Sequence, residues 1–428
     1  MDNGAGGGAE HREESSFAGR FGLRFLLAYA LLYSFPFPLT LAPFGGHLEL
    51  LWSGAWSQFV LGVAQALGIE VTALPAGSGD TTFNYVELLA FAALALTFAL
   101  TWVLLPRRVS ETRWRALFSL HLRFVLATAM LGYGFAKVFP GQFGPPTLDR
   151  LNSTYGESSP MGLLWTLMGL SRPYAIFGGA LEVLGGLLLL FPTTAVLGAL
   201  VSVAVMANVV ALNFCFDVPV KLYSSHLLLM ACGIALPDAR RLLAAGLGRA
   251  AQARPSFTWA TTGRGLRLVR ILRVLVLASI AVSQILGVKA VLSRQESSPP
   301  TPLSGLWRFE QRTVGGAAES AIEGVAPLET VFFSDYGVVL FRDAAAGAER
   351  LRFALDEAAG TVTLTPFGTP VVQEPPRVLR YSRAGERLEL RETLDGAEVV
   401  TGFTRVPERG YLLTERGFHW INEFPLNR

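Results

Sequence analysis

Charged residues are scarce in this sequence. Asp, Glu, Lys and Arg make up 16% of its 428 residues, whereas soluble domains carry about 25%. Hydrophobic residues make up 51%, and mean hydropathy is +0.41. The net charge is only +3, and its basic residues cluster in short segments between apolar runs, which excludes a nucleic-acid-binding surface. Composition therefore predicts a membrane protein whose first partner is the lipid bilayer.

Cysteines and metal-binding patterns are also nearly absent. Cys215 and Cys232 lie in neighbouring apolar segments that would run antiparallel, which places them at different depths and predicts no disulfide. The five histidines are scattered, and the sequence contains no metal-ligand cluster, nucleotide-binding loop or serine nucleophile elbow. The first apolar run is long and no small-residue cleavage site ends it, so we expect no removable signal peptide.

Seven apolar stretches approach or reach the ~20 residues that a helix needs to cross a bilayer. They are residues 21–43, 83–105, 117–139, 174–190, 195–215, 222–236 and 268–292. The fourth and sixth are short and require tilting or help from flanking residues. We expect an all-α membrane bundle of about seven transmembrane helices over residues 18–292, preceded by a disordered cytoplasmic tail at residues 1–17.

Arginines indicate the orientation of this bundle. They concentrate in residues 107–115 and 240–273, between the second and third and between the sixth and seventh stretches. Because cytoplasmic loops carry the excess of Lys and Arg, these segments and the N-terminus are expected in the cytoplasm of a bacterium, with the protein in its inner membrane. The opposite loops contain apolar stretches at residues 50–67 and 161–170. We expect helices there that lie in the outer interface or pack on each other as a cap.

A β-rich domain is expected after the last span. Residues 293–302 are rich in Ser and Pro and predict a linker, and residues 303–428 alternate with period two between turn residues. Expected strands are 330–333, 337–341, 350–353, 361–365, 377–381, 387–392 and 398–403. They predict an all-β antiparallel barrel or sandwich, which an odd number of crossings places in the periplasm, where it would meet a periplasmic protein partner. Residues 416–428 would form a closing strand or dock on the membrane domain.

Ionisable and polar residues near the outer ends of the helices suggest a site. Lys137, Asp217 and His226 are expected at one depth, where burial would lower the pKa of the lysine and allow acid–base catalysis. Tyr133, one turn before Lys137, and Asn213 and Lys221 would help to bind a ligand. Each of the three central residues also has a structural interpretation: Lys137 reaching the interface, Asp217 capping a helix or pairing with Lys221, and His226 hydrogen-bonded in the core.

Glu182 lies deeper, near the middle of the fourth stretch, where a carboxyl group must be protonated or paired. One expectation is a structural pair with Arg123 or Asn208; the other is a functional role, in which Glu182 and Asn208 help to bind a ligand. Alternatively, Glu182 and Asn208 would line a transport path, although no broken-helix repeat supports transport. The nearby pairs at residues 178–179 and 185–186 are glycines, which favour close helix packing.

Two short motifs resemble those of DoxX-like membrane proteins. They are Gly134-x-x-Lys137 and the segment from Gly179 through Glu182 to Gly186 and the leucines that follow. The resemblance covers about a quarter of the chain, residues 117–237. It implies a role in membrane redox chemistry, as in a subunit of a thiosulfate–quinone oxidoreductase.

The position of Lys137 after a glycine, followed by an outward β-domain, also resembles vitamin K-dependent γ-carboxylase and its bacterial relatives, the HTTM group. That resemblance implies that Lys137 deprotonates a reduced quinone, so the expected cofactor is a quinone. The Gly305-x-Trp307 element resembles the opening of lipocalin-like barrels. Two functions remain open at this point: a redox protein that handles a quinone or a lipid, and a non-enzymatic anchor or assembly factor whose β-domain binds a partner.

Overall fold

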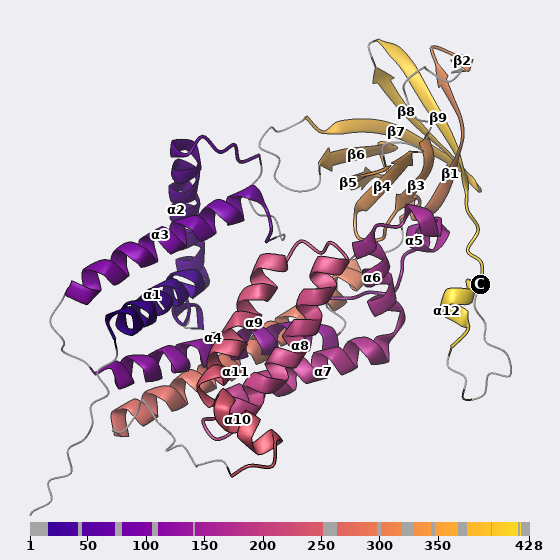
Figure 1. Ribbon diagram of the computed structural model, residues 1–428. Coiled ribbons are helices and arrows are strands. Elements are labelled where there is room, and N and C mark those ends of the chain that lie inside the picture. Colours follow the sequence, from indigo (N-terminus) through magenta and orange to yellow (C-terminus); the bar gives the residue numbers. More distant parts are fainter. Residues whose placement is uncertain are drawn as a thin grey trace, which may run out of the picture. The chain divides into compact units, whose positions relative to one another are not determined.

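A computed structural model describes residues 16–41, 45–72, 79–104, 110–139, 142–250, 263–297, 301–318, 328–343, 347–366, 375–394, 396–417 and 420. The chain divides into two compact units. The first, called the helical unit, contains residues 1–134, 180–214 and 219–282; the second, called the barrel unit, contains residues 135–179, 215–218 and 283–428. Four helices, at residues 111–138, 172–189, 195–215 and 263–297, have residues in both units. Figure 1 shows the helices and strands with their labels.

The helical unit is built from long apolar helices. Its elements, some shared with the barrel unit, are α1 (Phe17–Ser34), η1 (Leu39–Leu41), α2 (Gly45–Ala66), α3 (Thr82–Leu104), α4 (Glu111–Val138), α7 (Arg172–Leu189), α8 (Ala195–Cys215), α9 (Lys221–Ala235), η3 (Leu236–Asp238), α10 (Ala239–Gly246) and α11 (Gly263–Ser297). Helix α1 begins where the Ser16 hydroxyl accepts a hydrogen bond from the N–H of Gly19, at 3.2 Å. The tail predicted at residues 1–17 therefore ends earlier, and residues 1–15 lie outside the described part.

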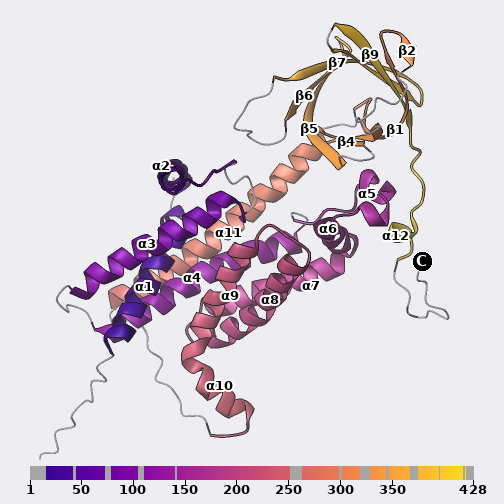
Figure 2. The same cartoon turned by 45° about the horizontal axis from the view of Figure 1, so that its top comes forward.

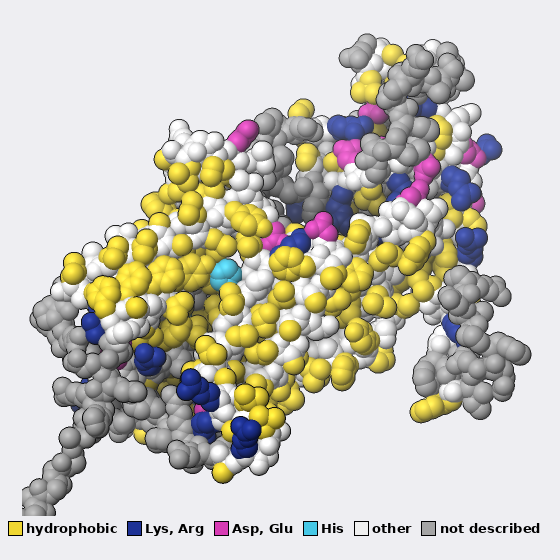
Figure 3. Space-filling model, in the orientation of Figure 1, with side chains coloured by type: hydrophobic (Ala, Val, Ile, Leu, Met, Phe, Trp, Pro, Cys, Tyr) yellow, Lys and Arg dark blue, Asp and Glu magenta, His cyan; other side chains and the backbone are white. Residues whose placement is uncertain are grey.

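Six helices among the described residues are long and apolar enough to cross a membrane. They correspond to six of the seven predicted stretches. The exception is the sixth stretch, where α9 has 15 residues and a length of ~22 Å. Hydrophobic side chains cover most of the visible surface of these helices, and Lys and Arg gather around α10 (Figure 3). Helix α2 packs on α3 through Val60, Ala64, Phe83 and Val86.

The barrel unit contains the loop between α4 and α7 and all the strands. The loop holds α5 (Leu148–Asn152), η2 (Tyr155–Glu157) and α6 (Pro160–Leu170). The strands are β1 (Gly305–Val314), β2 (Ala317–Ala318), β3 (Leu328–Phe333), β4 (Val338–Asp343), β5 (Gly347–Asp356), β6 (Thr361–Pro366), β7 (Arg377–Ala384), β8 (Arg387–Leu394) and β9 (Ala397–Arg405). A short helix, α12 (Leu412–Glu415), follows them.

The strands form a closed eight-stranded antiparallel barrel. Each strand from β3 to β9 pairs with the next, β1 pairs with β3, and β9 returns to pair with β1 from Trp307–Arg405 to Val314–Val399 (Figure 2). Strand β2 only extends the end of β1. Alternate side chains point inward and fill the interior, among them the fully buried Trp307, Phe333 and Phe403. Six of the seven predicted strands lie within strands of the β3–β9 series, and the seventh, 337–341, matches β4 except for Gly337. Of the two predicted alternatives, barrel and sandwich, the structure has the barrel.

Two predictions about the ends of this domain are wrong. Helix α11 continues to Ser297, five residues into the predicted linker at 293–302, because Arg294, Gln295 and Glu296 are good helix formers and the prolines come only at 299 and 300. The barrel is closed by β9 and not by residues 416–428, so the closing-strand alternative is wrong. The docking alternative stays a prediction, because only residues 416, 417 and 420 of that segment are described. Strand β1 was not predicted from alternation, because its buried residues, Leu306 and Trp307, are adjacent in the sequence.

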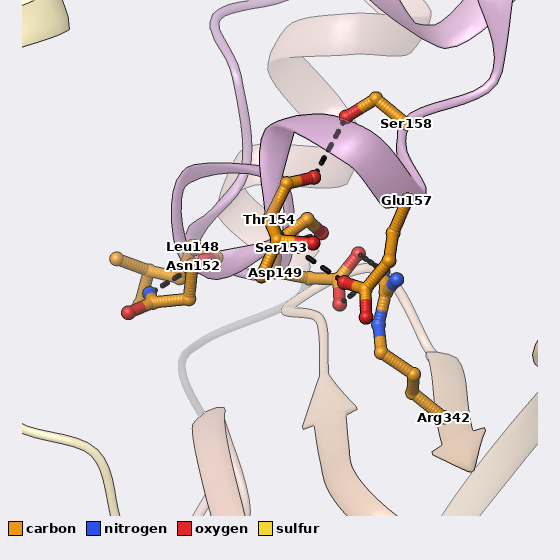
Figure 4. A network of polar contacts seen from close by, with 8 residues as sticks. All are labelled: Leu148, Asp149, Asn152, Ser153, Thr154, Glu157, Ser158 and Arg342. Atoms are coloured by element: carbon orange, nitrogen blue, oxygen red, sulfur yellow. Dashed lines mark hydrogen bonds and ion pairs between the residues drawn. The ribbon is translucent and has the colours of Figure 1, made fainter. Parts of the chain in front are cut away.

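The loop and the barrel are bound together within the barrel unit. Arg342 of β4 donates to both carboxylate oxygens of Asp149 on α5, at 3.0 and 3.1 Å (Figure 4). Asp149 is buried, and the pair is charge-assisted, which makes it one of the stronger kinds of hydrogen bond. Asn152 adds a hydrogen bond from its side-chain amide to the Tyr411 hydroxyl. These contacts place the α4–α7 loop directly against the barrel.

Candidate functional site

His226 lies within an aromatic cluster of the helical unit. Its Nδ1 is 2.7 Å from the Leu222 carbonyl oxygen, and a carbonyl can only accept, so in the neutral ring Nδ1 carries the hydrogen. Its Nε2 then accepts from the Tyr29 hydroxyl, at 2.8 Å. The imidazole stacks on Tyr33, with ring centres 4.2 Å apart and planes 9° from parallel. Both ring nitrogens are therefore engaged by protein groups, in agreement with the structural interpretation of this histidine.

A cavity of about 260 Å³ opens beside this cluster, between α1, α4 and α9. Its lining is mostly apolar, with hydroxyl groups from three helices. The lining residues are Tyr33, Ser34, Phe37, Val125, Thr128, Ala129, Tyr223, Leu227 and Met230. The volume lies just below the ~300–1,000 Å³ of pockets that enclose a drug-sized ligand, so the cavity suits one ring-sized group.

Two of the four hydroxyl groups in this lining are already committed. Thr128 donates to the Phe124 carbonyl at 2.8 Å. Ser34 donates to the Ala30 carbonyl at 2.7 Å, so its oxygen accepts from His121 Nε2, at 2.9 Å. The hydroxyls of Tyr33 and Tyr223, by contrast, make no hydrogen bond within the described residues. These two phenols are the donors that the cavity offers to a ligand.

A second layer of side chains supports the aromatic cluster from α2 and α3. Phe91 meets the rings of Tyr29 and Tyr33 edge-on, at 6.4 and 6.1 Å, and stacks on Trp56 at 4.9 Å. The indole N–H of Trp56 donates to Glu87 at 2.8 Å. Edge-to-face and stacked ring pairs contribute energy beyond the area that they bury, so this layer fixes the rings of α1 beside His226.

Glu182 lies on α7 and is 3% exposed. It interacts electrostatically with Tyr133, whose ring centre lies 5.9 Å from that of Tyr223. The glycines one turn later allow this approach: a Cβ at Gly186 would meet Leu131 at 2.8 Å, and one at Gly185 would meet Ser202 at the same distance. Two of the predicted binding residues, Tyr133 and Glu182, are thus linked to one wall of the cavity.

The two expected partners of Glu182, Arg123 and Asn208, have other surroundings. Arg123 donates from Nε to the Leu189 carbonyl oxygen at the end of α7, at 3.0 Å. Asn208, although mid-helix in α8, is exposed on the surface of the helical unit. A buried carboxyl and an exposed amide are in different surroundings, and the structure adds nothing in favour of a transport path through both.

Asn213 and Lys221 have structural partners. The buried Asn213 amide donates to the Ser224 hydroxyl at 3.0 Å and joins α8 to α9. The Lys221 ammonium lies 3.8 Å from Asp80. The Asp80 carboxylate also accepts from the backbone N–H groups of Lys221 and Leu222, at 2.8 and 2.9 Å, and so caps α9 from the segment before α3.

Lys137 and Asp217 belong to the barrel unit, whereas His226 belongs to the helical unit. Lys137 is half-buried in the last turn of α4, where Arg172 donates to the backbone carbonyls of Lys137 and Val138. Asp217 ends α8 with a φ of 50° and is exposed. The convergence of Lys137, Asp217 and His226 stays a prediction, and the cavity described above does not depend on it.

Several residues around the cavity were missed by sequence reasoning: Tyr29, Tyr33, Tyr223 and His121. A signal was present, because Tyr29 and Tyr33 are one turn apart on α1, and Tyr223 and His226 are one turn apart on α9. Polar aromatic residues on one face of an apolar helix require partners.

The described ranges contain no group of three or more His, Cys, Asp or Glu that could hold a metal ion. Both cysteines, Cys215 and Cys232, are free thiols, as the sequence predicted.

Comparison with known proteins gives one informative match. No family model and no solved structure matches the chain. "Uncharacterized protein YwoB" of Bacillus subtilis (strain 168) is 36% identical over 121 residues. The aligned region is 28% of this chain and 77% of YwoB. The chain therefore belongs to the same protein family as YwoB.

Proposed function

We propose that this protein is a multi-pass protein of a bacterial cytoplasmic membrane that binds a quinone ring in the cavity between α1, α4 and α9. The N-terminus would be cytoplasmic and the barrel periplasmic, as the arginine distribution suggests. The observation that carries the binding proposal is a pair of phenols, Tyr33 and Tyr223, whose hydroxyls make no hydrogen bond in the described part of the chain and which line a mostly apolar cavity.

Quinone chemistry matches this lining. A quinone head group is a flat ring with carbonyl oxygens that accept hydrogen bonds, and its tail is an apolar chain. Phenol hydroxyls can donate to such oxygens, while Phe37, Leu227 and Met230 offer apolar contact for the ring. The surrounding helices are apolar over lengths that match a bilayer, so the tail would remain among the lipids. The membrane redox function implied by the DoxX-like motifs supports the same ligand class.

The test is quinone binding to the purified full-length protein in nanodiscs, measured as quenching of intrinsic fluorescence by a short-chain benzoquinone. Tyr33→Phe and Tyr223→Phe keep the rings and remove one donor each. Since a hydrogen bond contributes about 0.5–1.5 kcal/mol, we expect each variant to bind about 2–10-fold more weakly. Ala129→Leu should block the cavity, because Ala129 lines it.

Tyr85→Phe is the matched control, because Tyr85 is exposed on α3 and does not line the cavity. An alkane of the same chain length without the ring should not compete. Unchanged affinity in the Tyr33→Phe/Tyr223→Phe double variant, with folding retained, would remove the proposed site.

A further inference from the structure

A second and larger hollow lies elsewhere in the helical unit. It has a volume of about 590 Å³ and is formed by α8, α9, η3 and α10. Its walls are apolar, including Leu200 and Val203 of α8, Cys232 of α9, and Leu243 and Leu247 at α10. We call it the α10 groove. None of its lining residues belongs to the cavity between α1, α4 and α9.

Helix α10 is strongly two-sided. Ala239, Leu243 and Leu247 recur every four residues and face the groove, as one side of a helix does. Arg240 follows Ala239 by 100° around the helix, so its side chain lies at the border of that apolar side. Arg240 is exposed. An amphipathic helix with Arg at the edge of its apolar side is typical of the membrane interface.

A second arginine lies at the other end of α10. Gly248 adopts a φ of 69°, and the N–H of Arg249 returns to the Ala244 carbonyl at 2.8 Å. This turn ends the helix and leaves Arg249 exposed, directly after the groove-lining Leu247. Arg241, by contrast, is paired with Asp238. Two exposed cations therefore flank an apolar groove.

We propose that the α10 groove binds one anionic phospholipid, with an acyl chain against α8 and α9 and its head group attracted by the exposed arginines at the two ends of α10, Arg240 and Arg249. An acyl chain matches the apolar lining, which presents almost no polar group. The phosphate matches the two cations by charge and by the geometry of guanidinium groups. Anionic lipids are also abundant in the cytoplasmic leaflet, and each Lys or Arg near that surface contributes attraction.

The experiment is native mass spectrometry of the full-length protein in detergent, titrated with phosphatidylglycerol or phosphatidylcholine of identical acyl chains. The wild type should prefer phosphatidylglycerol. Arg240→Gln should lose about fivefold in phosphatidylglycerol affinity, as expected for one interfacial arginine, and Arg240→Gln/Arg249→Gln should bind both lipids alike. Arg115→Gln is the control, because Arg115 is exposed on α4 and does not line the groove.

A second variant tests the acyl chain independently of charge. Gly246 lines the groove, and a Cβ there meets no atom within 4 Å, so Gly246→Phe should fill the groove without disturbing the fold. It should weaken both lipids and leave the ratio between them nearly unchanged. Equal binding of the two lipids by the wild type would overturn the proposal. So would an undiminished preference in the double arginine variant, or full binding by Gly246→Phe.

Discussion

At the scale of single residues, Asp80 organises the start of α9. Its carboxylate accepts two backbone N–H groups of the first turn of that helix and lies near the Lys221 ammonium. The neighbouring Gly79 N–H donates to the Pro219 carbonyl at 2.9 Å. A carboxylate at a helix N-terminus satisfies unpaired N–H groups and interacts favourably with the helix dipole. Since His226 and Tyr223 lie on the first two turns of α9, Asp80 also positions one side of the cavity.

Replacing Asp80 should therefore destabilise the protein. We expect Asp80→Ala to lower the free energy of unfolding by about 1–3 kcal/mol, because two partly buried N–H groups lose their acceptor. Asp80→Asn keeps one acceptor oxygen and should cost less. The measurement is the midpoint of thermal unfolding in detergent, with Glu70→Gln, an exposed carboxylate after α2, as control. A midpoint for Asp80→Ala equal to that of the control would contradict this role.

The Asp80 contact shows what the sequence could not predict at this scale. Residue types were informative: buried or half-buried polar groups in the apolar runs, such as Glu182, Asn213 and His226, do have specific surroundings. The sequence did not predict which groups contact each other across the fold. Asp80 and Lys221, for example, are 141 residues apart, and no local spacing connects them. For the same reason, the contact between Tyr29 and His226 was not predicted, since these residues are 197 positions apart in the sequence.

At the scale of elements, arginine side chains cap the C-terminal ends of two helices by donating hydrogen bonds to backbone carbonyl oxygens. Arg24 donates to the Trp102 carbonyl near the end of α3 at 3.0 Å. Arg123 and Arg273 donate to Leu189 and Leu190 at the end of α7, at 3.0 and 3.2 Å. The last carbonyls of a helix lack intrahelical donors and carry partial negative charge. These arginines therefore have a structural role, which for Arg273 comes in addition to the orientation signal of residues 240–273.

The η2 element provides a prediction about pH. Thr154 and Glu157 form a capping box, in which the Thr154 N–H donates to Glu157 at 3.2 Å. The side-chain hydrogen bond with Thr154 and then this backbone bond hold the pKa of Glu157 below its usual range. A carboxyl group with a lowered pKa in the folded state stabilises the fold above its ordinary pKa of about 4.3. That contribution disappears as the pH falls through the lowered pKa.

We therefore expect the difference in thermal midpoint between the wild type and Glu157→Gln to shrink as the pH falls from 6 to about 3. The variant retains an amide oxygen as acceptor but cannot titrate, so other carboxyl groups cancel in the difference. A difference that stays constant over this range would show that the capping box does not stabilise the charged form of Glu157.

Element prediction was accurate where hydrophobic period and turn residues agree. Strands β3 to β9 alternate, and four of the turns between them contain a glycine with positive φ, at residues 337, 360, 385 and 396, so the positions of these strands were predictable. Helix α9 was predicted at nearly the right residues, but its crossing depends on the lipid thickness and on its neighbours, which the hydropathy of 15 residues does not determine.

At the scale of the whole molecule, the contact between Asp149 and Arg342 constrains the topology. Because the two side chains form an ion pair, we expect the α4–α7 loop and the barrel to lie on the same side of a membrane. Between that loop and the barrel the chain runs through α7, α8, α9 and α11. If α7, α8 and α11 each cross a membrane, an even number of crossings is required to return to the same side, so we expect α9 to cross together with them. The seventh predicted span then has a support that does not depend on hydropathy.

The resulting arrangement can be tested with single cysteines in a Cys215→Ser/Cys232→Ser background. Tyr155→Cys in the loop, Glu386→Cys in the barrel and Arg113→Cys at the start of α4 are all exposed positions. We expect a membrane-impermeant maleimide to label the first two in cells with a permeabilised outer membrane, and the third only after lysis, because arginine-rich segments stay in the cytoplasm. Labelling of all three in the reverse pattern would invert the orientation but keep seven crossings. Labelling of Tyr155→Cys and Glu386→Cys from opposite sides would show instead that α9 does not cross, and would separate the loop from the barrel that the Asp149–Arg342 pair joins.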